Sequence, residues 1–327
     1  MTGPRSLVWE VTARCPLRCS HCYNVWTAPG AGMPSELSPR ARLQLVERLL
    51  PLRRGLRALT LGGGEPLLLD DLEQLVVRIH KLLPRTRISL STSGLLLSAS
   101  RALALARAGV DVVQLTLLSA RPETHDEMVG QQGAHEQVIA ALAAVKQAGM
   151  LAAVFFVATR RNIGEWPGAA RLALALGADA LMFNRFQPGG RGLTRWRELT
   201  PTPEQLDGAM TRTDELRALG PVQLGTALPP CELSQRPGKT DLLRCPIGTR
   251  NAYPTIGPDG ALRPCNHWPT VLGSLLEQPL ARLLRRPEPG LRRLPPECVS
   301  CRWARRCGGG CPAARALAGQ AIYARRR

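Results

Sequence analysis

Short runs of apolar and β-branched residues alternate with longer amphipathic stretches over the first two thirds of the chain. The short runs contain few polar residues, a pattern typical of parallel strands that are buried on both faces. The longer stretches carry apolar residues at helical spacing, and several end at a glycine, which commonly terminates a helix. The pattern predicts strands over residues 7–12, 58–61, 87–92, 112–118, 151–158 and 180–186, and helices over residues 38–50, 71–83, 99–108, 135–148, 165–176 and 203–219.

Six consecutive strand-then-helix units favour a parallel sheet, because each crossover helix returns the chain in the same direction. We expect an α/β fold, a partial (β/α)6 TIM-like barrel whose working face lies at the carboxyl ends of the strands. Proline, glycine and cysteine become more frequent near residue 225. The chain therefore predicts a barrel over residues 1–225 and a small cysteine-rich domain over residues 226–327, which metal stabilises because its loops supply little apolar core.

The amino-acid composition limits the classes of molecule that this protein is expected to bind. The 327 residues carry a formal net charge of +18, and only three of the basic residues are lysine. A basic surface attracts acidic peptides, phosphates or nucleic acid, but aromatic residues make up only 4% and the arginines are scattered, which disfavours nucleic acid. No long apolar run or signal segment is present, so we expect a cytoplasmic protein without a membrane partner, in which ten cysteines indicate metal rather than disulfides.

Three cysteines directly follow the first predicted strand. Cys15, Cys19 and Cys22 have the spacing C-x3-C-x2-C. Three thiolates leave one iron of a [4Fe-4S] cluster open to another ligand, because such a cluster normally takes four cysteines. The alternative is a tetrahedral zinc site, for which His21 is the only nearby fourth ligand.

Glycines and hydroxyl groups follow the next predicted strands. The second strand leads into Gly62-Gly63-Gly64-Glu65-Pro66, and the third ends in Ser91-Thr92-Ser93-Gly94. Glycines let the backbone approach a ligand closely, and a neighbouring carboxylate can accept hydrogen bonds from an ammonium group. Taken alone, the glycine string is equally consistent with a simple turn.

The order and spacing of these motifs resemble the radical S-adenosylmethionine (SAM) superfamily. The resemblance implies that the open iron binds the amino and carboxylate groups of SAM, and that an electron from the cluster cleaves SAM to methionine and a 5′-deoxyadenosyl radical, which abstracts hydrogen from a substrate. Two positions depart from the usual pattern: Ser93 replaces an asparagine and Leu118 replaces an acid. The resemblance implies cofactor-binding roles for His21, Gly62, Gly63, Gly64, Glu65, Ser91, Ser93, Thr116 and Arg185, the last as a clamp for the SAM carboxylate.

Most of the remaining cysteines form a second pattern near the C-terminus. Cys245 and Cys265 flank a hairpin predicted around Pro258-Asp259-Gly260, so they can converge. Four further thiolates lie within 14 residues, at positions 298, 301, 307 and 311. A zinc ribbon is the alternative interpretation of these four cysteines.

This second pattern resembles the SPASM domain of radical SAM peptide maturases, which holds one or two auxiliary [4Fe-4S] clusters. The resemblance assigns Cys245, Cys265 and Cys311 to a first auxiliary cluster, and Cys298, Cys301 and Cys307 to a second. A seventh cysteine, expected after Cys311, is missing, and Cys231 is a metal-ligand candidate whose role the spacing does not fix. A non-cysteine ligand such as His267 or Asp241, or an open iron that binds a substrate thiolate, would make up the ligand count.

The sequence therefore predicts a radical SAM/SPASM enzyme that modifies a ribosomally synthesised peptide or a protein side chain. The expected partners are a precursor peptide or small-molecule substrate, an electron donor such as flavodoxin or ferredoxin, and a separate leader-binding protein, because the barrel begins within about ten residues of the first residue. The alternatives are maturation of a tetrapyrrole or another cofactor, a non-catalytic iron–sulfur electron carrier, and zinc-dependent nucleic-acid binding.

His80 and His125 have no second ligand residue at a spacing typical of metal sites, and both are interpreted as surface or helix residues. The catalytic acid or base and the substrate stay unassigned.

Overall fold

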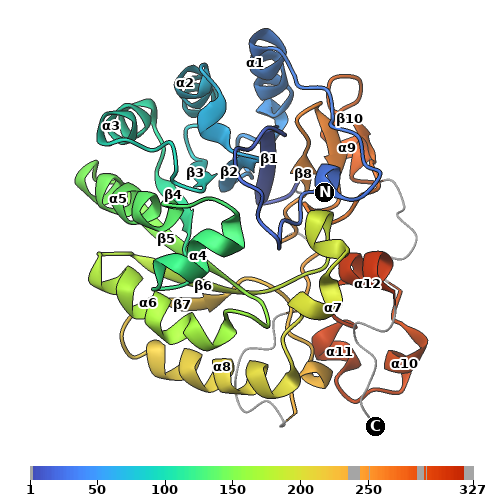
Figure 1. The fold of residues 1–327 in the computed structure, drawn as a ribbon. Coiled ribbons are helices and arrows are strands. Elements are labelled where there is room, and N and C mark those ends of the chain that lie inside the picture. The colour runs from blue at the N-terminus through green and yellow to red at the C-terminus, as the bar shows by residue number, and fades with distance from the viewer. Residues whose placement is uncertain (1–2, 235–243, 250, 286–290, 292, 320–327) are drawn as a thin grey trace.

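Parallel strands form the centre of the molecule. A computed structural model describes residues 3–234, 244–249, 251–285, 291 and 293–319. In these ranges seven parallel strands pair in chain order, with helices outside them (Figure 1). The fold is the predicted partial TIM-like barrel. The strands are β1 (Ser6–Thr12), β2 (Ala58–Gly63), β3 (Arg87–Thr92), β4 (Val112–Thr116), β5 (Leu151–Ala158), β6 (Ala180–Arg185) and β7 (Val222–Leu224).

The outer helices begin and end where local sequence signals place them. Ser38 caps the first helix by accepting the Ala41 N–H at 3.2 Å, and Thr202 forms a reciprocal capping box with Gln205. The barrel helices are α1 (Pro39–Arg48), α2 (Leu72–Leu82), α3 (Ala99–Ala108), α4 (Pro122–Val129), α5 (Ala134–Gln147), α6 (Trp166–Ala175), α7 (Trp196–Leu199) and α8 (Pro203–Leu216). The six predicted helices are confirmed to within a few residues.

The segment after β4 differs from the prediction. The strand ends at Thr116 rather than at residue 118, because the Leu118 N–H donates to Nδ1 of His125 at 3.2 Å instead of continuing the sheet. His125 lies on α4, a short helix that the apolar pattern did not predict, and its side chain is only 3% exposed. His125 is therefore a helix residue, as one of the two alternatives predicted, and it is buried rather than on the surface.

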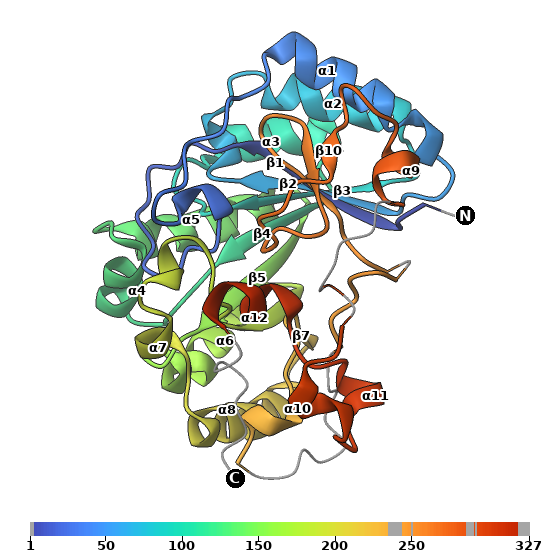
Figure 2. The ribbon, with the colours of Figure 1, turned by 90° about the vertical axis from the view of Figure 1, so that its right-hand side faces the viewer.

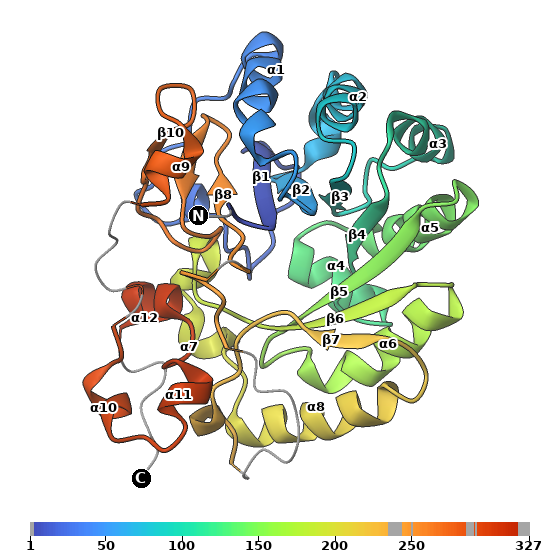
Figure 3. The same ribbon diagram turned by 180° about the vertical axis from the view of Figure 1, so that it is seen from behind.

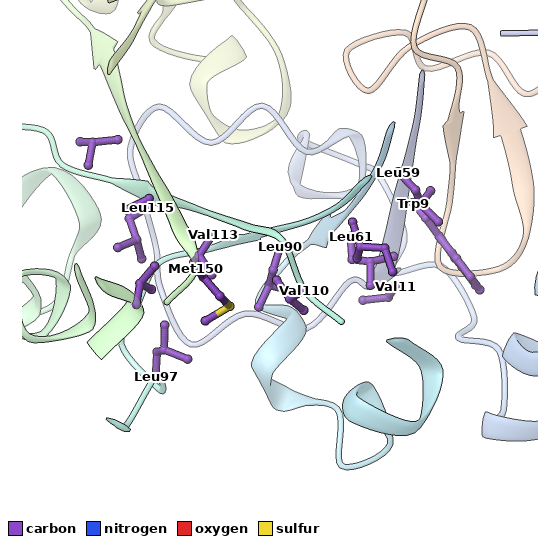
Figure 4. Packing of buried hydrophobic residues seen from close by; sticks show 14 of the residues in the cluster. Trp9, Val11, Leu59, Leu61, Leu90, Leu97, Val110, Val113, Leu115 and Met150 are labelled. Carbon is purple, nitrogen blue, oxygen red and sulfur yellow. The ribbon is translucent and has the colours of Figure 1, made fainter. Parts of the chain in front are cut away.

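One large hydrophobic cluster lies between the sheet and the helices. Figure 4 shows side chains of successive strands within it, among them Trp9, Leu61, Leu90 and Val113, all fully buried. Because alternate residues of a strand point to opposite faces, packing this outer face leaves the other residues to line the barrel interior. The core thus fixes the carboxyl ends of the strands relative to one another.

The cysteine-rich segment extends the barrel sheet. β8 (Thr255–Ile256) pairs parallel with β1, and β8, β9 (Ala261–Arg263) and β10 (Gly273–Ser274) follow one another antiparallel, which confirms the predicted hairpin. The predicted boundary near residue 225 falls directly after β7, and the division into two domains stays a prediction.

Short helices complete this segment: η6 (Pro230–Glu232), α9 (Leu280–Leu283), α10 (Pro296–Val299), α11 (Ala304–Cys307) and α12 (Pro312–Ala318). Viewed from the open side of the barrel, α10 to α12 and the β8–β10 strands lie across the opening (Figure 2). Among the helices that the structure describes, none combines the length and the apolar character needed to span a membrane.

Two buried ion pairs join the barrel to this segment. Glu10 of β1 contacts Arg263 of β9, and Arg185 of β6 pairs with Glu232 of η6. All four side chains are at most 8% exposed. Buried charges are strongly unfavourable without a partner, so each pair fixes the position of one element relative to the other.

Candidate active site

The first three cysteines lie on the loop that follows β1, at the carboxyl edge of the sheet. The Cys22 N–H donates to the Cys19 carbonyl at 3.2 Å, which closes a turn. The loop is also bonded to the end of α4, since the Arg18 N–H donates to the Val129 carbonyl at 3.0 Å. The helix that the sequence pattern did not predict therefore supports the cysteine loop.

The three thiols interact with one another. Burial, followed by the thiols of Cys22 and Cys15, raises the pKa of Cys19 to about 12. The Thr27 hydroxyl donates to Sγ of Cys22 at 3.7 Å. A cation bound among these sulfurs would reverse the shift, because metal binding deprotonates a coordinating thiol.

A glycine turn after β6 packs against the cysteine loop. A Cβ atom on Gly190 would lie 2.6 Å from the Cys22 carbonyl oxygen, so only glycine fits there. Arg191 donates from Nη1 to the Cys19 carbonyl at 3.0 Å. This contact with the cysteine loop spans about 170 residues of chain and depends on the order of the strands.

The glycine string after β2 also contacts the cysteine loop through its backbone. A Cβ on Gly64 would lie 2.1 Å from the Arg14 carbonyl oxygen, and one on Gly63 would lie 2.4 Å from that of Thr12. Asn24 donates from Nδ2 to the Gly63 carbonyl at 2.8 Å, a contact that the sequence did not indicate. Gly63 and Gly64 therefore hold the cysteine loop close to β2, in addition to any contact with a cofactor.

The carboxylate of Glu65 joins the ends of β2 and β3. One oxygen accepts from the Thr92 hydroxyl at 2.6 Å and the Leu67 N–H at 3.1 Å. The other accepts from the Ser93 N–H at 2.9 Å and the Ser93 hydroxyl at 2.5 Å. Ser93, the departure from the family pattern, is thus an intramolecular donor, and the role of Glu65 toward an ammonium group stays a prediction.

The other predicted cofactor contacts divide into two groups. Ser91 and Thr116 each follow a buried leucine that faces the helices, so strand alternation directs both hydroxyls to the barrel interior. His21 is 8% exposed, and its Nδ1 atom has no hydrogen-bond partner among the described residues. Arg185 donates from Nη1 to Oε1 of Glu232 at 2.7 Å, and its role as a clamp for the SAM carboxylate stays a prediction.

The first C-terminal group of cysteines lines a cleft. Cys245, Cys265 and Cys311 line one cleft that is open to solvent, together with Gln187, Tyr253 and His267. Burial and the thiols of Cys311 and Cys245 raise the pKa of Cys265. The structure therefore brings together the three thiols that the SPASM resemblance assigns to one cluster.

The cleft lies beside the N-terminal cysteine loop. The ring of Tyr23, the residue after Cys22, stacks on the ring of His267 with centroids 4.4 Å apart. His267 is two residues after Cys265. This stack joins the two cysteine sites, and Asp241, the other non-cysteine ligand considered, lies outside the described residues.

The second C-terminal group gathers on α10 and α11. Burial comes first among the causes that raise the pKa of Cys298, followed by Glu297 and the thiols of Cys307 and Cys301. The Cys301 N–H donates to the Cys298 carbonyl at 3.1 Å, which turns the chain so that these thiols converge. The described residues include all ten cysteines, and no disulfide bond joins any of them.

Comparison with known proteins identifies this arrangement. The family model described as the radical SAM superfamily matches residues 9–172, half of the chain. The chain belongs to the radical SAM superfamily. It is 30% identical over 280 residues to the PqqA peptide cyclase of Granulibacter bethesdensis, covering 85% of this chain and 71% of that protein. It is 33% identical over 293 residues to the PqqA peptide cyclase of Streptomyces rochei, covering 87% and 74%.

Solved structures share the fold. SuiB of Streptococcus suis bound to S-adenosylmethionine superposes with a TM-score of 0.72 at 16% identity, covering 95% of this chain and 73% of SuiB. Native anSMEcpe with bound AdoMet gives a TM-score of 0.71 at 19% identity, covering 97% and 91%. The barrel and the cysteine-rich segment of this radical SAM enzyme therefore follow an architecture found in SAM-bound proteins.

The residues around the N-terminal cysteines fit the radical SAM cofactors, a [4Fe-4S] cluster and SAM. The three thiols of the loop interact with one another, and a [4Fe-4S] cluster binds each thiolate through a separate iron. Nδ1 of His21 has no hydrogen-bond partner among the described residues, and the glycines at 62–64 leave backbone open to close approach.

Proposed function

We propose that this radical SAM enzyme forms a crosslink within a ribosomally synthesised peptide. The observation that carries the proposal is the cleft at Cys245, Cys265 and Cys311, which the Tyr23–His267 stack places beside the radical site. The relatives named PqqA peptide cyclase support a peptide substrate, as does the similarity of fold to SuiB, which has been crystallised with its precursor peptide SuiA.

The chemistry of a crosslink agrees with two neighbouring cysteine sites. Forming one bond between two side chains removes two hydrogens from the peptide. One leaves as a hydrogen atom to the 5′-deoxyadenosyl radical that the radical SAM cofactors supply. The other leaves as a proton, and its electron needs an acceptor close to the substrate, a role that suits an auxiliary cluster held at Cys245, Cys265 and Cys311.

The lining of the cleft suits a peptide backbone. Gln187 is 6% exposed, and neither Nε2 nor Oε1 of its amide has a hydrogen-bond partner among the described residues. An amide offers both a donor and an acceptor, which match the C=O and N–H groups of a peptide. We therefore assign Gln187 the task of orienting the peptide in the cleft.

The positive charge of the enzyme favours an acidic peptide. We expect weak binding that falls as salt screens the net charge of +18. Fluorescence anisotropy of a labelled peptide at low and high salt measures this, and tight binding that does not change with salt would contradict it. A separate leader-binding protein and a flavodoxin or ferredoxin donor belong to the same proposal.

The radical site is tested by replacing Cys15, Cys19 and Cys22 together with alanine. Formation of 5′-deoxyadenosine should cease while auxiliary iron remains, and undiminished SAM cleavage would refute the assignment. The substrate is tested with an acidic candidate precursor peptide, for which mass spectrometry should show the loss of two hydrogens. If the parent enzyme cleaves SAM but leaves the peptide unchanged, cofactor maturation becomes the better explanation.

A further inference from the structure

The carboxylate of Glu65 is buried and has a full set of hydrogen bonds within the chain. Glu65 is 0% exposed and directly follows β2, and most of its donors lie at the end of the neighbouring β3 (Figure 3). An ionised carboxylate has about four lone-pair sites, two on each oxygen. Four donors reach them: the Leu67 N–H, the Thr92 hydroxyl, and both the N–H and the hydroxyl of Ser93. A further donor, such as the ammonium group of SAM, therefore has to replace one of the four.

Three of the four donors are fixed by the fold. Two of them are backbone N–H groups, and that of Leu67 lies in η3 (Pro66–Leu68), the short helix that Glu65 caps. Thr92 is buried, and its hydroxyl also accepts the Gly94 N–H at 3.1 Å. Turning the Thr92 hydroxyl away would leave this N–H without its acceptor, which is unfavourable inside the protein.

The Ser93 hydroxyl is the donor that can move. It rotates about a single bond, and the Ser93 side chain is only half-buried. Its other contact, with the Leu95 N–H, is long at 3.4 Å. The Ser93 N–H keeps its own hydrogen bond to the same Glu65 oxygen, at 2.9 Å, while the hydroxyl turns. The hydroxyl can thus leave Glu65 without disturbing the backbone or the other donors.

We propose that the ammonium group of SAM replaces the Ser93 hydroxyl on Glu65, so that Ser93 is a positioning residue that sets how tightly the enzyme binds SAM. The exchange keeps the buried carboxylate fully hydrogen-bonded, which avoids the cost of an unsatisfied buried charge. Methionine, a product of SAM cleavage, has the same ammonium group, so the returning hydroxyl also favours its release. The proposal rests on the predicted role of Glu65 toward SAM and is independent of the peptide substrate.

Binding of SAM to the holoenzyme tests the proposal. Equilibrium dialysis with oxidised clusters measures the dissociation constant without cleavage of SAM, because cleavage needs an electron. Ser93→Ala removes the competing donor, so we expect its affinity for SAM to rise by about three- to tenfold. Its thermal unfolding midpoint without SAM should fall by about 2 °C, because the buried carboxylate loses one donor. A purely structural role of Ser93 would instead lower both the affinity and the midpoint.

Matched variants and a second ligand serve as controls. Thr92→Val removes a fixed donor and the acceptor of the Gly94 N–H, so the SAM affinity and the unfolding midpoint should both fall. Ser93→Thr keeps a hydroxyl and should bind SAM as the parent enzyme does. 5′-Methylthioadenosine has no ammonium group, so Ser93→Ala should bind it no more tightly than the parent does.

Two results would overturn the proposal. One is SAM binding by Ser93→Ala that is unchanged or weaker than in the parent, and the other is an equal gain in affinity for methylthioadenosine. Glu65→Gln checks the role on which the proposal rests, because an amide cannot replace the charge of the carboxylate. Parent-like SAM binding by Glu65→Gln would remove the ammonium contact and the proposal with it, while leaving the peptide crosslink untouched.

Discussion

At the scale of single residues, Gly64 in the active site lies directly against the backbone of Arg14. A Cβ atom at Gly64 would lie 2.1 Å from a carbonyl oxygen that cannot rotate away. We expect Gly64→Ala to displace the cysteine loop and to lower the free energy of unfolding by about 2 kcal/mol or more. Chemical denaturation and iron content measure the effect.

Gly62→Ala is the matched control for this prediction. Its Cβ would meet Cβ of Ser91 at 3.4 Å and the Ser91 carbonyl oxygen at 3.9 Å, which are ordinary van der Waals contacts. We expect the control to change the free energy of unfolding by less than about 1 kcal/mol. Equal losses in the two variants would show that backbone approach does not decide the choice of glycine at position 64.

The buried His125 makes stability depend on pH. Burial, followed by the neighbouring His135, lowers its pKa from 6.5 to about 4, while Asp126 acts in the opposite direction. As the pH falls below 6.5, the unfolded chain binds the proton first, so the free energy of unfolding decreases until the pH reaches about 4. The full loss is about 3 kcal/mol.

His125→Asn tests this dependence, because asparagine keeps an acceptor for the Leu118 N–H without titrating. The difference in unfolding free energy between parent and variant, measured across this pH range, cancels effects common to both proteins. That difference should shift in favour of the variant at low pH. A difference that does not vary with pH would exclude His125 as the titrating group.

At the scale of elements, two glycines of the helical layer have opposite roles. Gly208 lies within α8, and a Cβ there would meet nothing within 4 Å. Gly130 ends α4 with φ at +73°, a conformation that alanine adopts only with strain. We expect Gly208→Ala to raise the free energy of unfolding by about 1 kcal/mol and Gly130→Ala to lower it by a similar amount.

Thermal or chemical denaturation of both variants measures this pair. Because α4 also holds the cysteine loop through the Arg18–Val129 hydrogen bond, Gly130→Ala should reduce iron at the radical site as well. Gly208→Ala should leave the iron content unchanged. Stabilisation by both substitutions would contradict the role of Gly130 as a helix end.

At the scale of the whole molecule, the Glu10–Arg263 pair joins the first strand of the barrel to the C-terminal hairpin. Arg263 also donates to the Asn266 carbonyl at 3.0 Å, next to Cys265. Arg263→Met leaves Glu10 buried without its partner, which should cost about 3–5 kcal/mol of unfolding free energy. The double variant Glu10→Leu/Arg263→Met should recover most of this loss, whereas purely additive losses would mean that the pair is not coupled.

The sequence by itself determined the features that depend on local spacing. Short stretches of sequence were enough to predict six strands and six helices, because the spacing of apolar residues and the helix-capping residues are local signals. Local spacing also identified the glycines after β2 and the ligand candidates Cys15, Cys19 and Cys22. The hairpin at residues 258–260 follows from its turn residues in the same way. Each of these is encoded within a few tens of residues.

Only the tertiary structure decided which distant groups meet. Arg185 pairs with Glu232, 47 residues later in the sequence, a contact that no local pattern indicated. β8 joins β1 across about 250 residues, and Arg263 of β9 meets Glu10 of β1. These contacts depend on the order and closure of the strands, a property of the assembled sheet that local sequence pattern does not encode.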